Sequence, residues 1–248
     1  MHNETAVRFR GRPRRVLALA GTSVVLLLSS ALAARSGPAL PDEIPASERS
    51  QLIEVTENAS LATHAAGEPF VARREVFEYL LDHPEFAAHL TRTLRIARYR
   101  IWREPDGLWL DDGWGTVGRF AVVYAGNGTR VMHARGGYTH WLLPTIRGQA
   151  VVVIEYGVQP AGDGKSLISA AVTGFVKLEN PLVEMASRLL SRTARAKAER
   201  EARQLVKVFA RTTRAIEHDP AGVHELLRLR PDVSRPELEA FRQLLRLP

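Results

Sequence analysis

The chain has 248 residues, of which 45% are hydrophobic and 25% are charged, and its formal net charge is +7. These fractions are ordinary for a soluble domain, so they exclude general disorder and a membrane protein with many spans. The sequence has no cysteine, which excludes disulfides, thiolate metal sites and a lipid-modified cysteine.

Residues 1–34 have the pattern of an export leader. Five arginines between Arg8 and Arg15 precede an uncharged apolar run, and small residues suited to signal peptidase follow at positions 31–34. We expect a signal peptide cleaved after Ala33 or Ala34. The alternative is an uncleaved N-terminal anchor, because residues 16–34 have nearly the length of a spanning helix. Both interpretations predict an exported domain, periplasmic or anchored facing the periplasm.

Removal of the leader changes the charge of the protein. Residues 1–34 hold five of the 34 basic side chains and one of the 27 acidic ones, so the net charge falls from +7 to +3. That charge is too small to predict a nucleic-acid partner. The sequence has 30 arginines and 4 lysines, a ratio that favours a bacterial source with a GC-rich genome.

The N-terminal part of the exported chain contains few clear elements. Residues 35–50 are rich in Pro, Ser and charge, which predicts a flexible linker. Residues 51–63 fit a strand or one face of a helix equally well, and both alternatives stay open. From Pro69 the spacing of Phe70, Phe77 and Leu81 predicts a helix. A second short helix is expected after Pro84.

Strands and one long helix are expected in the remainder. Turn residues separate six runs that predict an antiparallel meander, at positions 94–103, 108–110, 117–125, 129–141, 150–158 and 166–178. Asn180 and Pro181 then open a long helix that reaches His218. Residues 219–248 form a tail with two short helices, 223–229 and 235–247.

This order of elements resembles the helix-grip fold of the START-like superfamily, also called SRPBCC or Bet v 1-like, over about residues 50–218. Its most suggestive segment is residues 69–101, PFVARREVFEYLLDHPEFAAHLTRTLRIARYRI. The resemblance implies an α+β fold in which a curved antiparallel sheet grips a long C-terminal helix. It also implies an apolar cavity between sheet and helix, which in relatives holds a sterol, a phospholipid tail or a polyketide.

Two sets of residues could line such a cavity. The sheet is rich in aromatic residues, and the middle of the long helix presents small side chains that could leave space. The alternative for both sets is ordinary core packing. The candidates are Tyr124, Tyr138, Trp141, Tyr156, Phe175, Ala194, Ala198 and Ala202. The segment Arg135-Gly136-Gly137-Tyr138 is expected to mark sheet curvature or the mouth of the cavity, because paired glycines weaken a strand.

The long helix is also rich in arginine. Arg192, Arg195 and Arg203 are candidates for contact with anionic lipid head groups, with a solvated helix face as the alternative. No catalytic motif or metal-ligand spacing is present, so no catalytic residue, cofactor or metal is predicted.

These features predict an exported protein that binds an apolar small molecule or lipid. One alternative is a membrane-anchored structural or adaptor protein that acts through the basic helix. Another is a cyclase or hydrolase of the same fold, for which clustering of Asp111, His133 and Tyr138 would be the first sign.

Overall fold

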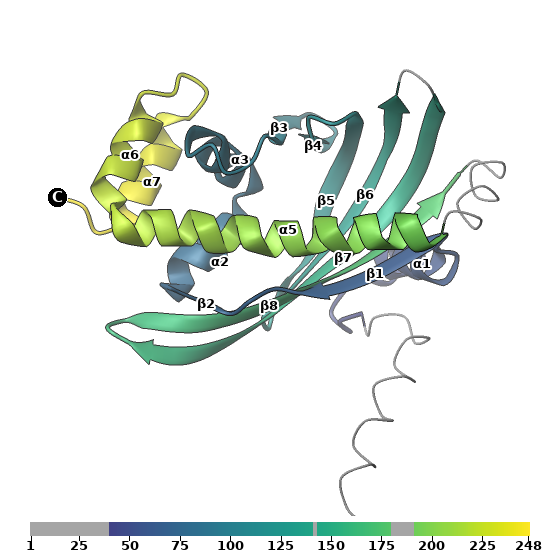
Figure 1. The fold of residues 1–248 in the computed structure, drawn as a ribbon, viewed down its shortest axis with the longest axis horizontal. Helices are drawn as coiled ribbons and strands as arrows, with labels where there is room; N and C mark the ends of the chain where they lie inside the picture. Colours follow the sequence, from purple (N-terminus) through teal and green to yellow (C-terminus); the bar gives the residue numbers. More distant parts are fainter. Residues whose placement is uncertain (1–39, 141–142, 180–190) are drawn as a thin grey trace, which may run out of the picture. The chain divides into compact units, whose positions relative to one another are not determined.

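The computed structural model describes residues 40–140, 143–179 and 191–248 (Figure 1). Contacts group the chain from Pro38 onward into one unit. The predicted leader at residues 1–34, Trp141, and the predicted start of the long helix at Asn180 and Pro181 lie outside the described residues. No helix in the described part is long and apolar enough to cross a membrane.

An antiparallel sheet forms the centre of this unit. Its strands are β1 (Leu61–Ala66), β2 (Phe70–Ala72), β3 (Arg100–Glu104), β4 (Gly107–Asp111), β5 (Thr116–Gly126), β6 (Thr129–His140), β7 (Leu143–Gly162) and β8 (Lys165–Leu178). They are ordered β1-β8-β7-β6-β5-β4-β3, and β2 also pairs with β8. The meander predicted from the six apolar runs is therefore confirmed.

Tight turns fix the register of the meander. Asn127 (φ 48°) and Gly128 (φ 71°) connect β5 to β6, and Asp163 (φ 50°) and Gly164 (φ 70°) connect β7 to β8. Two successive residues with positive φ form the hairpin turn that matches the twist of the flanking strands.

Helices lie on both faces of the sheet (Figure 1). They are α1 (Ala46–Glu57), α2 (Arg74–Asp82), α3 (Pro84–Thr93), α5 (Ser191–His218), α6 (Pro220–Arg228) and α7 (Arg235–Leu244). Helix α5 packs mainly on β1, β2 and β8, whereas α1 covers the opposite face of β7 and β8. We call the α5 side the concave face and the α1 side the convex face.

Three expectations for the N-terminal part need correction. Helix α1 begins at Ala46, so residues 46–50 belong to the fold and not to a flexible linker. The segment 51–63 contains both alternatives, because the helix reaches Glu57 and β1 begins at Leu61. Phe70 lies in strand β2 and not in the first helix. Its ring still packs on Phe77 of α2, with ring centres 5.6 Å apart.

Alternation along the strands divides the core into two layers. Val131, Val151 and Val153 point to the convex face and pack with Leu52 and Val55 of α1. Their neighbours along the strands point the other way, as successive strand residues must. On the concave face Ile154, Ala170 and Val172 pack against α2 and α5.

A row of glycines crosses the middle of the sheet. Gly118 of β5 pairs with Gly136 of β6, and Gly136 pairs in turn with Gly148 of β7. A Cβ at Gly136 would lie 2.6 Å from the Gly118 Cα atom, so the backbones approach more closely than side chains would permit. Such rows let a sheet bend. The expectation that Gly136 marks curvature agrees with this row.

The C-terminal helices are part of the core. Phe241 of α7 is fully buried, and its ring centre lies 4.8 Å from that of Phe86 in α3. Leu80, Ile216 and Leu227 belong to the same cluster. Residues that were expected to form a tail therefore complete the packing of α2 and α3.

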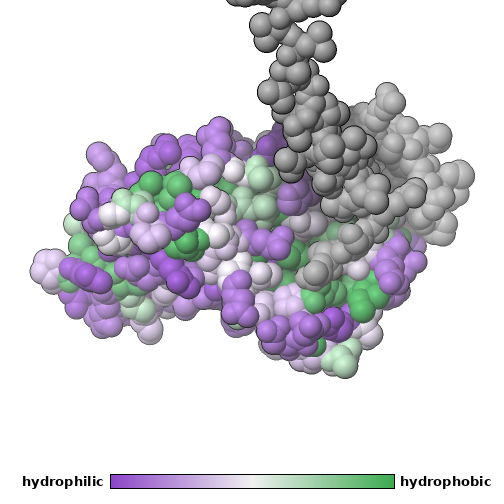
Figure 2. Space-filling view, turned by 90° about the horizontal axis from the view of Figure 1, so that it is seen from below, coloured by the Kyte–Doolittle hydropathy of each residue, from purple (hydrophilic) through white to green (hydrophobic). Residues whose placement is uncertain are grey.

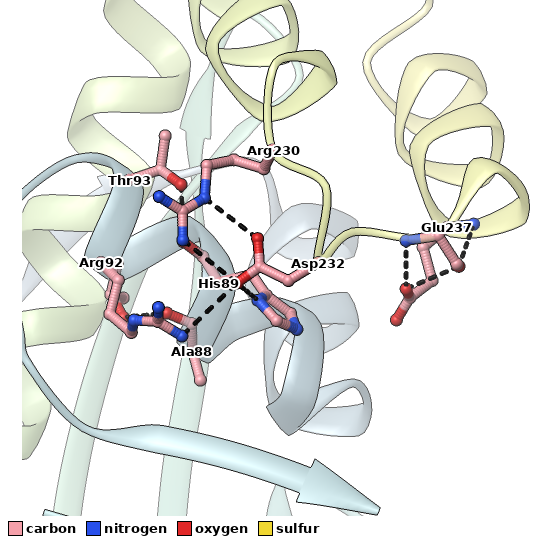
Figure 3. A network of polar contacts seen from close by, with 9 residues as sticks. Ala88, His89, Arg92, Thr93, Arg230, Asp232 and Glu237 are labelled. Atoms are coloured by element: carbon pink, nitrogen blue, oxygen red, sulfur yellow. Dashed lines mark hydrogen bonds and ion pairs between the residues drawn. The ribbon is translucent and has the colours of Figure 1, made fainter.

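A polar network fastens the loop between α6 and α7 to α3 (Figure 3). The Asp232 carboxylate accepts two hydrogen bonds of 3.1 Å from Arg230. It also lies 3.1 Å from His89 Nδ1 and 3.6 Å from an Arg92 nitrogen. Because Arg92 and Arg230 share this single carboxylate, their charges are only partly neutralised.

A second network fixes the C-terminal end of α5. Glu217, whose side chain is 12% exposed, accepts a 2.9 Å hydrogen bond from Arg73 Nε and lies 3.3 Å from Lys165. Burial acts to raise the pKa of Glu217, but hydrogen bonds from Arg73 and Lys165 and the Arg73 charge hold it below its usual 4.5. The network thus connects α5 to the start of α2 and to the β7–β8 hairpin.

Because the pKa of Glu217 is lower in the folded state, its contribution to stability is present above pH 4.5 and is lost as the pH falls. We expect Glu217→Gln to cost about 1–3 kcal/mol at neutral pH, since it leaves Arg73 without its partner. The cost should shrink in acid, as urea unfolding at several pH values would show. Glu201→Gln, an exposed change on the same helix, is the control. An equal cost at every pH would contradict the prediction.

Candidate functional site: the concave face of the sheet

The space between the C-terminal half of α5 and the sheet is filled. Leu205, Val206 and Phe209 of α5 pack there against Phe77 and Ile154. The remaining hollow has a volume of about 10 Å³, which is close to the least that one water molecule needs. An apolar ligand therefore has no room in this part of the interface.

The concave face of β5 and β6 is covered less completely. Phe120 pairs with Ala134 and Val122 pairs with Met132, and by alternation these side chains and Tyr138 point to the concave face. All five are partly or well exposed, and Val122 is 38% exposed. We call Phe120, Val122, Met132, Ala134 and Tyr138 the concave patch.

The glycine row adds open surface to this patch. Gly118 and Gly136 lie between Phe120 and Ala134 on one side and Tyr138 on the other. Because glycine has no side chain, a strip along Gly118 and Gly136 on the concave face consists of backbone alone.

A polar cluster borders the patch beyond Met132. Arg130, only 7% exposed, donates 2.8 and 3.2 Å hydrogen bonds to the two Asp82 oxygens. The Tyr156 hydroxyl donates a 2.8 Å hydrogen bond to Glu78. Burial, together with this bond, raises the pKa of Tyr156. Because these groups satisfy one another, they position α2 on the sheet.

The predicted aromatic lining is divided between the two faces. Tyr138 and Tyr156 lie on the concave face. Tyr124 and Phe175 pack on the convex face against α1, so the prediction that they line the cavity is wrong. A β-bulge between Val122 and Tyr124 shifts the register, so that Tyr124 pairs with Val131 and turns to the α1 side.

The predicted helix residues are only partly described. Ala202 is 7% exposed and packs closely against the sheet, which fits ordinary core packing. Arg203 is exposed and lies 3.8 Å from Glu199 of the same helix. The side chains of Ala194, Ala198, Arg192 and Arg195 lie outside the described residues. Contact with anionic lipid by Arg192, Arg195 and Arg203 stays a prediction.

The residues considered for catalysis do not come together. Asp111 and His133 lie on the convex face, where Asp111 pairs with Arg100 and His133 Nε2 lies 3.3 Å from Gln149 Oε1. Tyr138 points to the opposite face. Within the described residues no three His, Asp or Glu side chains are grouped as a metal site would require.

No protein-family model matches the sequence, and no curated protein matches it. The chain is similar in structure to TTHA0849 from Thermus thermophilus, with 12% identity and a TM-score of 0.32 over 62% of this chain and 98% of that one. It is also similar to Ara h 8.0201, with 12% identity and a TM-score of 0.30 over 60% and 98% of the two chains. A third is norcoclaurine synthase from Thalictrum flavum with dopamine and hydroxybenzaldehyde, at 15% identity and a TM-score of 0.32 over 67% and 92%.

Likenesses this distant do not define a ligand or an activity. The class of fold follows from the topology itself: an α+β chain in which two strands, two helices and a six-strand antiparallel meander precede a long helix on the concave face. This arrangement agrees with the helix-grip fold that the sequence resemblance implies.

Proposed function

We propose that this chain is an exported binding protein that holds an apolar ligand, such as a lipid chain, on the concave patch. The observation that carries the proposal is the half-exposed apolar surface of β5 and β6, which α5 does not cover as it covers β1 and β8. Each Å² of apolar surface removed from water contributes about 25 cal/mol. A ligand on this surface would therefore gain affinity from burial alone.

The proposed site lies away from the interface under the C-terminal half of α5, which side chains fill and which has no room for a ligand. An apolar molecule would lie along the glycine row, between Phe120 and Tyr138. The polar cluster of Arg130, Asp82 and Tyr156 would border it. Carboxylate-bound Arg130 has no free charge to offer, which favours an uncharged ligand at that end.

Export is the second part of the proposal, and the leader pattern supports it. A carrier would be released by cleavage after Ala33 or Ala34, whereas an uncleaved leader would keep the domain at the membrane. The mass of the exported chain distinguishes these outcomes. A chain that stays in the cytoplasm would contradict this part of the proposal without affecting the binding part.

A bulky side chain should block the concave patch. We expect Ala134→Trp to weaken binding of the neutral probe N-phenyl-1-naphthylamine about tenfold or more, because the indole would occupy the strip. Fluorescence titration measures the affinity. Extraction and mass spectrometry of the purified protein would then identify co-purified lipid.

The matched control is Ala121→Trp. Ala121 lies on β5 beside Phe120, is exposed and points to the convex face, so the same substitution there should leave probe binding unchanged. Thermal unfolding of both variants verifies that they fold. Equal binding to both variants, or no binding to the unmodified protein, would reject the concave patch as the site.

A further inference from the structure

A second hollow lies on another part of the surface, where α3 ends and the chain turns into β3. It has a volume of about 480 Å³ and is lined by Arg92, Arg95, Ile96, Ala97 and Arg98. Three of these five residues are arginines, and none is acidic. The hollow therefore combines room for a small molecule or head group with a concentration of positive charge.

The positive charge in this hollow is only partly neutralised by the protein around it. Arg100 and Arg103, a few residues further along the chain, are paired with Asp111 and Glu85. Within the described part of the chain, Arg95 and Arg98 form no ion pair. Arg92 lies 3.6 Å from Asp232, but this carboxylate also accepts two hydrogen bonds from Arg230 (Figure 3).

At the end of α3, backbone carbonyl groups accept hydrogen bonds from backbone N–H groups rather than from these arginines. The Thr91 carbonyl accepts hydrogen bonds from Ile96 N (2.8 Å) and Ala97 N (3.3 Å), and the Arg92 carbonyl accepts one from Arg95 N (3.0 Å). The Thr91 and Arg92 carbonyl groups at the negative end of the helix are thus satisfied. Within the described residues, the guanidinium groups of Arg95 and Arg98 remain without an ion-pair partner.

Arg95 occupies a position where glycine is normally preferred. Its φ is 54°, in the left-handed conformation that closes a helix and that glycine adopts without steric cost. An arginine in this conformation adds a positive charge, but its backbone is strained.

Arg98 is held in place by an aromatic ring. Its guanidinium carbon lies 5.7 Å from the ring centre of Trp114, which is 71% exposed on the turn between β4 and β5. Figure 2 shows one face of the molecule, on which hydrophilic residues surround smaller hydrophobic groups. Asp112 fixes that turn, because its carboxylate accepts hydrogen bonds from the backbone N–H groups of Trp114 and Thr116. A guanidinium preorganised in this way loses little freedom when it binds an anion.

We propose that this hollow, formed by Arg92, Arg95 and Arg98, is a binding site for a phosphate group. Phosphate oxygens accept hydrogen bonds from several guanidinium groups at once, and arginine matches their geometry better than lysine does. Two sources share this chemistry, a soluble phosphate ester and the head group of an anionic phospholipid. The site is separate from the concave patch, so either proposal can fail without the other.

Arg95→Gly tests the proposal without harm to the fold. Glycine suits the backbone at this position, so thermal stability should be equal or higher while one guanidinium is lost. We expect binding of phosphate to weaken about tenfold, the effect of one charge-assisted hydrogen bond. Arg246→Gly is the matched control. Arg246 has φ 56° at the same position after α7 and is not among the residues that line the hollow.

Two measurements on the full chain distinguish the sources. Calorimetric titration with glycerol 3-phosphate measures the soluble ester. Co-sedimentation with vesicles of phosphatidylcholine, with and without an equal part of phosphatidylglycerol, measures the head group. A membrane site should also shift Trp114 emission to the blue, and Trp114→Phe should remove that shift. All variants carry the same leader, so its own membrane affinity cancels in the comparison.

Binding in either measurement that Arg95→Gly weakens and Arg246→Gly does not would support the site and identify its source. Equal weakening by both variants would indicate attraction by overall charge and overturn the proposal. Absence of binding to both glycerol 3-phosphate and phosphatidylglycerol vesicles would also overturn it.

Discussion

Replacing Phe241 by alanine should lower the free energy of unfolding by about 3–5 kcal/mol, the usual cost of deleting a fully buried aromatic ring. Phe241 is 0% exposed and lies on α7, near the end of the chain. Its ring packs on Phe86 of α3 and Tyr79 of α2, with ring centres 4.8 and 6.2 Å apart. The alanine variant would leave a cavity that these short helices can close only by moving.

Urea unfolding of the variant and of Leu229→Ala would measure this effect. Leu229 lies just after α6 and is 67% exposed, so its truncation should change stability by about 0.5 kcal/mol or less. The denaturant slope should stay unchanged for both variants if α6 and α7 unfold together with the sheet. A small loss for Phe241→Ala, or a separate early transition, would mean that the C-terminal helices are a detachable addition.

Helix boundaries in the C-terminal region could be predicted because the signals are local. Ser234 accepts a hydrogen bond from Glu237 N while the Glu237 side chain accepts one from Ser234 N, a capping box visible in the sequence. Asp219 caps α6 by accepting a hydrogen bond from Gly222 N, so this helix begins at Pro220, three residues before the predicted start at residue 223. The role of these helices in the core was not predictable, since it depends on contacts with α2 and α3 that are distant in sequence.

The error at Tyr124 has a different origin. Strand alternation predicts the face of a side chain only while the register continues, and a single extra residue reverses it. Between Val122 and Tyr124 the register shifts by one, and no glycine or proline marks the place. Tyr138, on a strand without a bulge before it, lies on the predicted face.

The start of helix α1 and the arginine hollow were missed for related reasons. Among residues 40–50, which are rich in Pro, Ser and charge, Ile44 is the buried apolar residue, and one such residue gives no periodicity that would distinguish a helix from a linker. Arg95 occupies a left-handed position that sequence rules assign to glycine or asparagine. Arg95 and Arg98 line the same hollow only because the chain turns there.

The contact between α5 and the sheet can be tested at Gly67, between β1 and β2. A methyl group at this position would overlap the Val206 side chain of α5, which is 3% exposed. The Gly67 N–H donates a 3.0 Å hydrogen bond to the Ala170 carbonyl, which holds the backbone in place. We therefore expect Gly67→Ala to cost about 1–3 kcal/mol, the usual penalty of overpacking.

Val206→Ala removes the atoms that the new methyl group would meet. The double variant should therefore be more stable than the sum of the single effects predicts, by about 1 kcal/mol or more in a double-mutant cycle. Gly157→Ala is the control, because a methyl group there meets no atom within 4 Å. Additive single effects would mean that α5 does not rest on the β1–β2 connection. This close contact leaves no volume beneath the helix. Without it, a ligand could lie under α5, and the concave patch would no longer be the expected site.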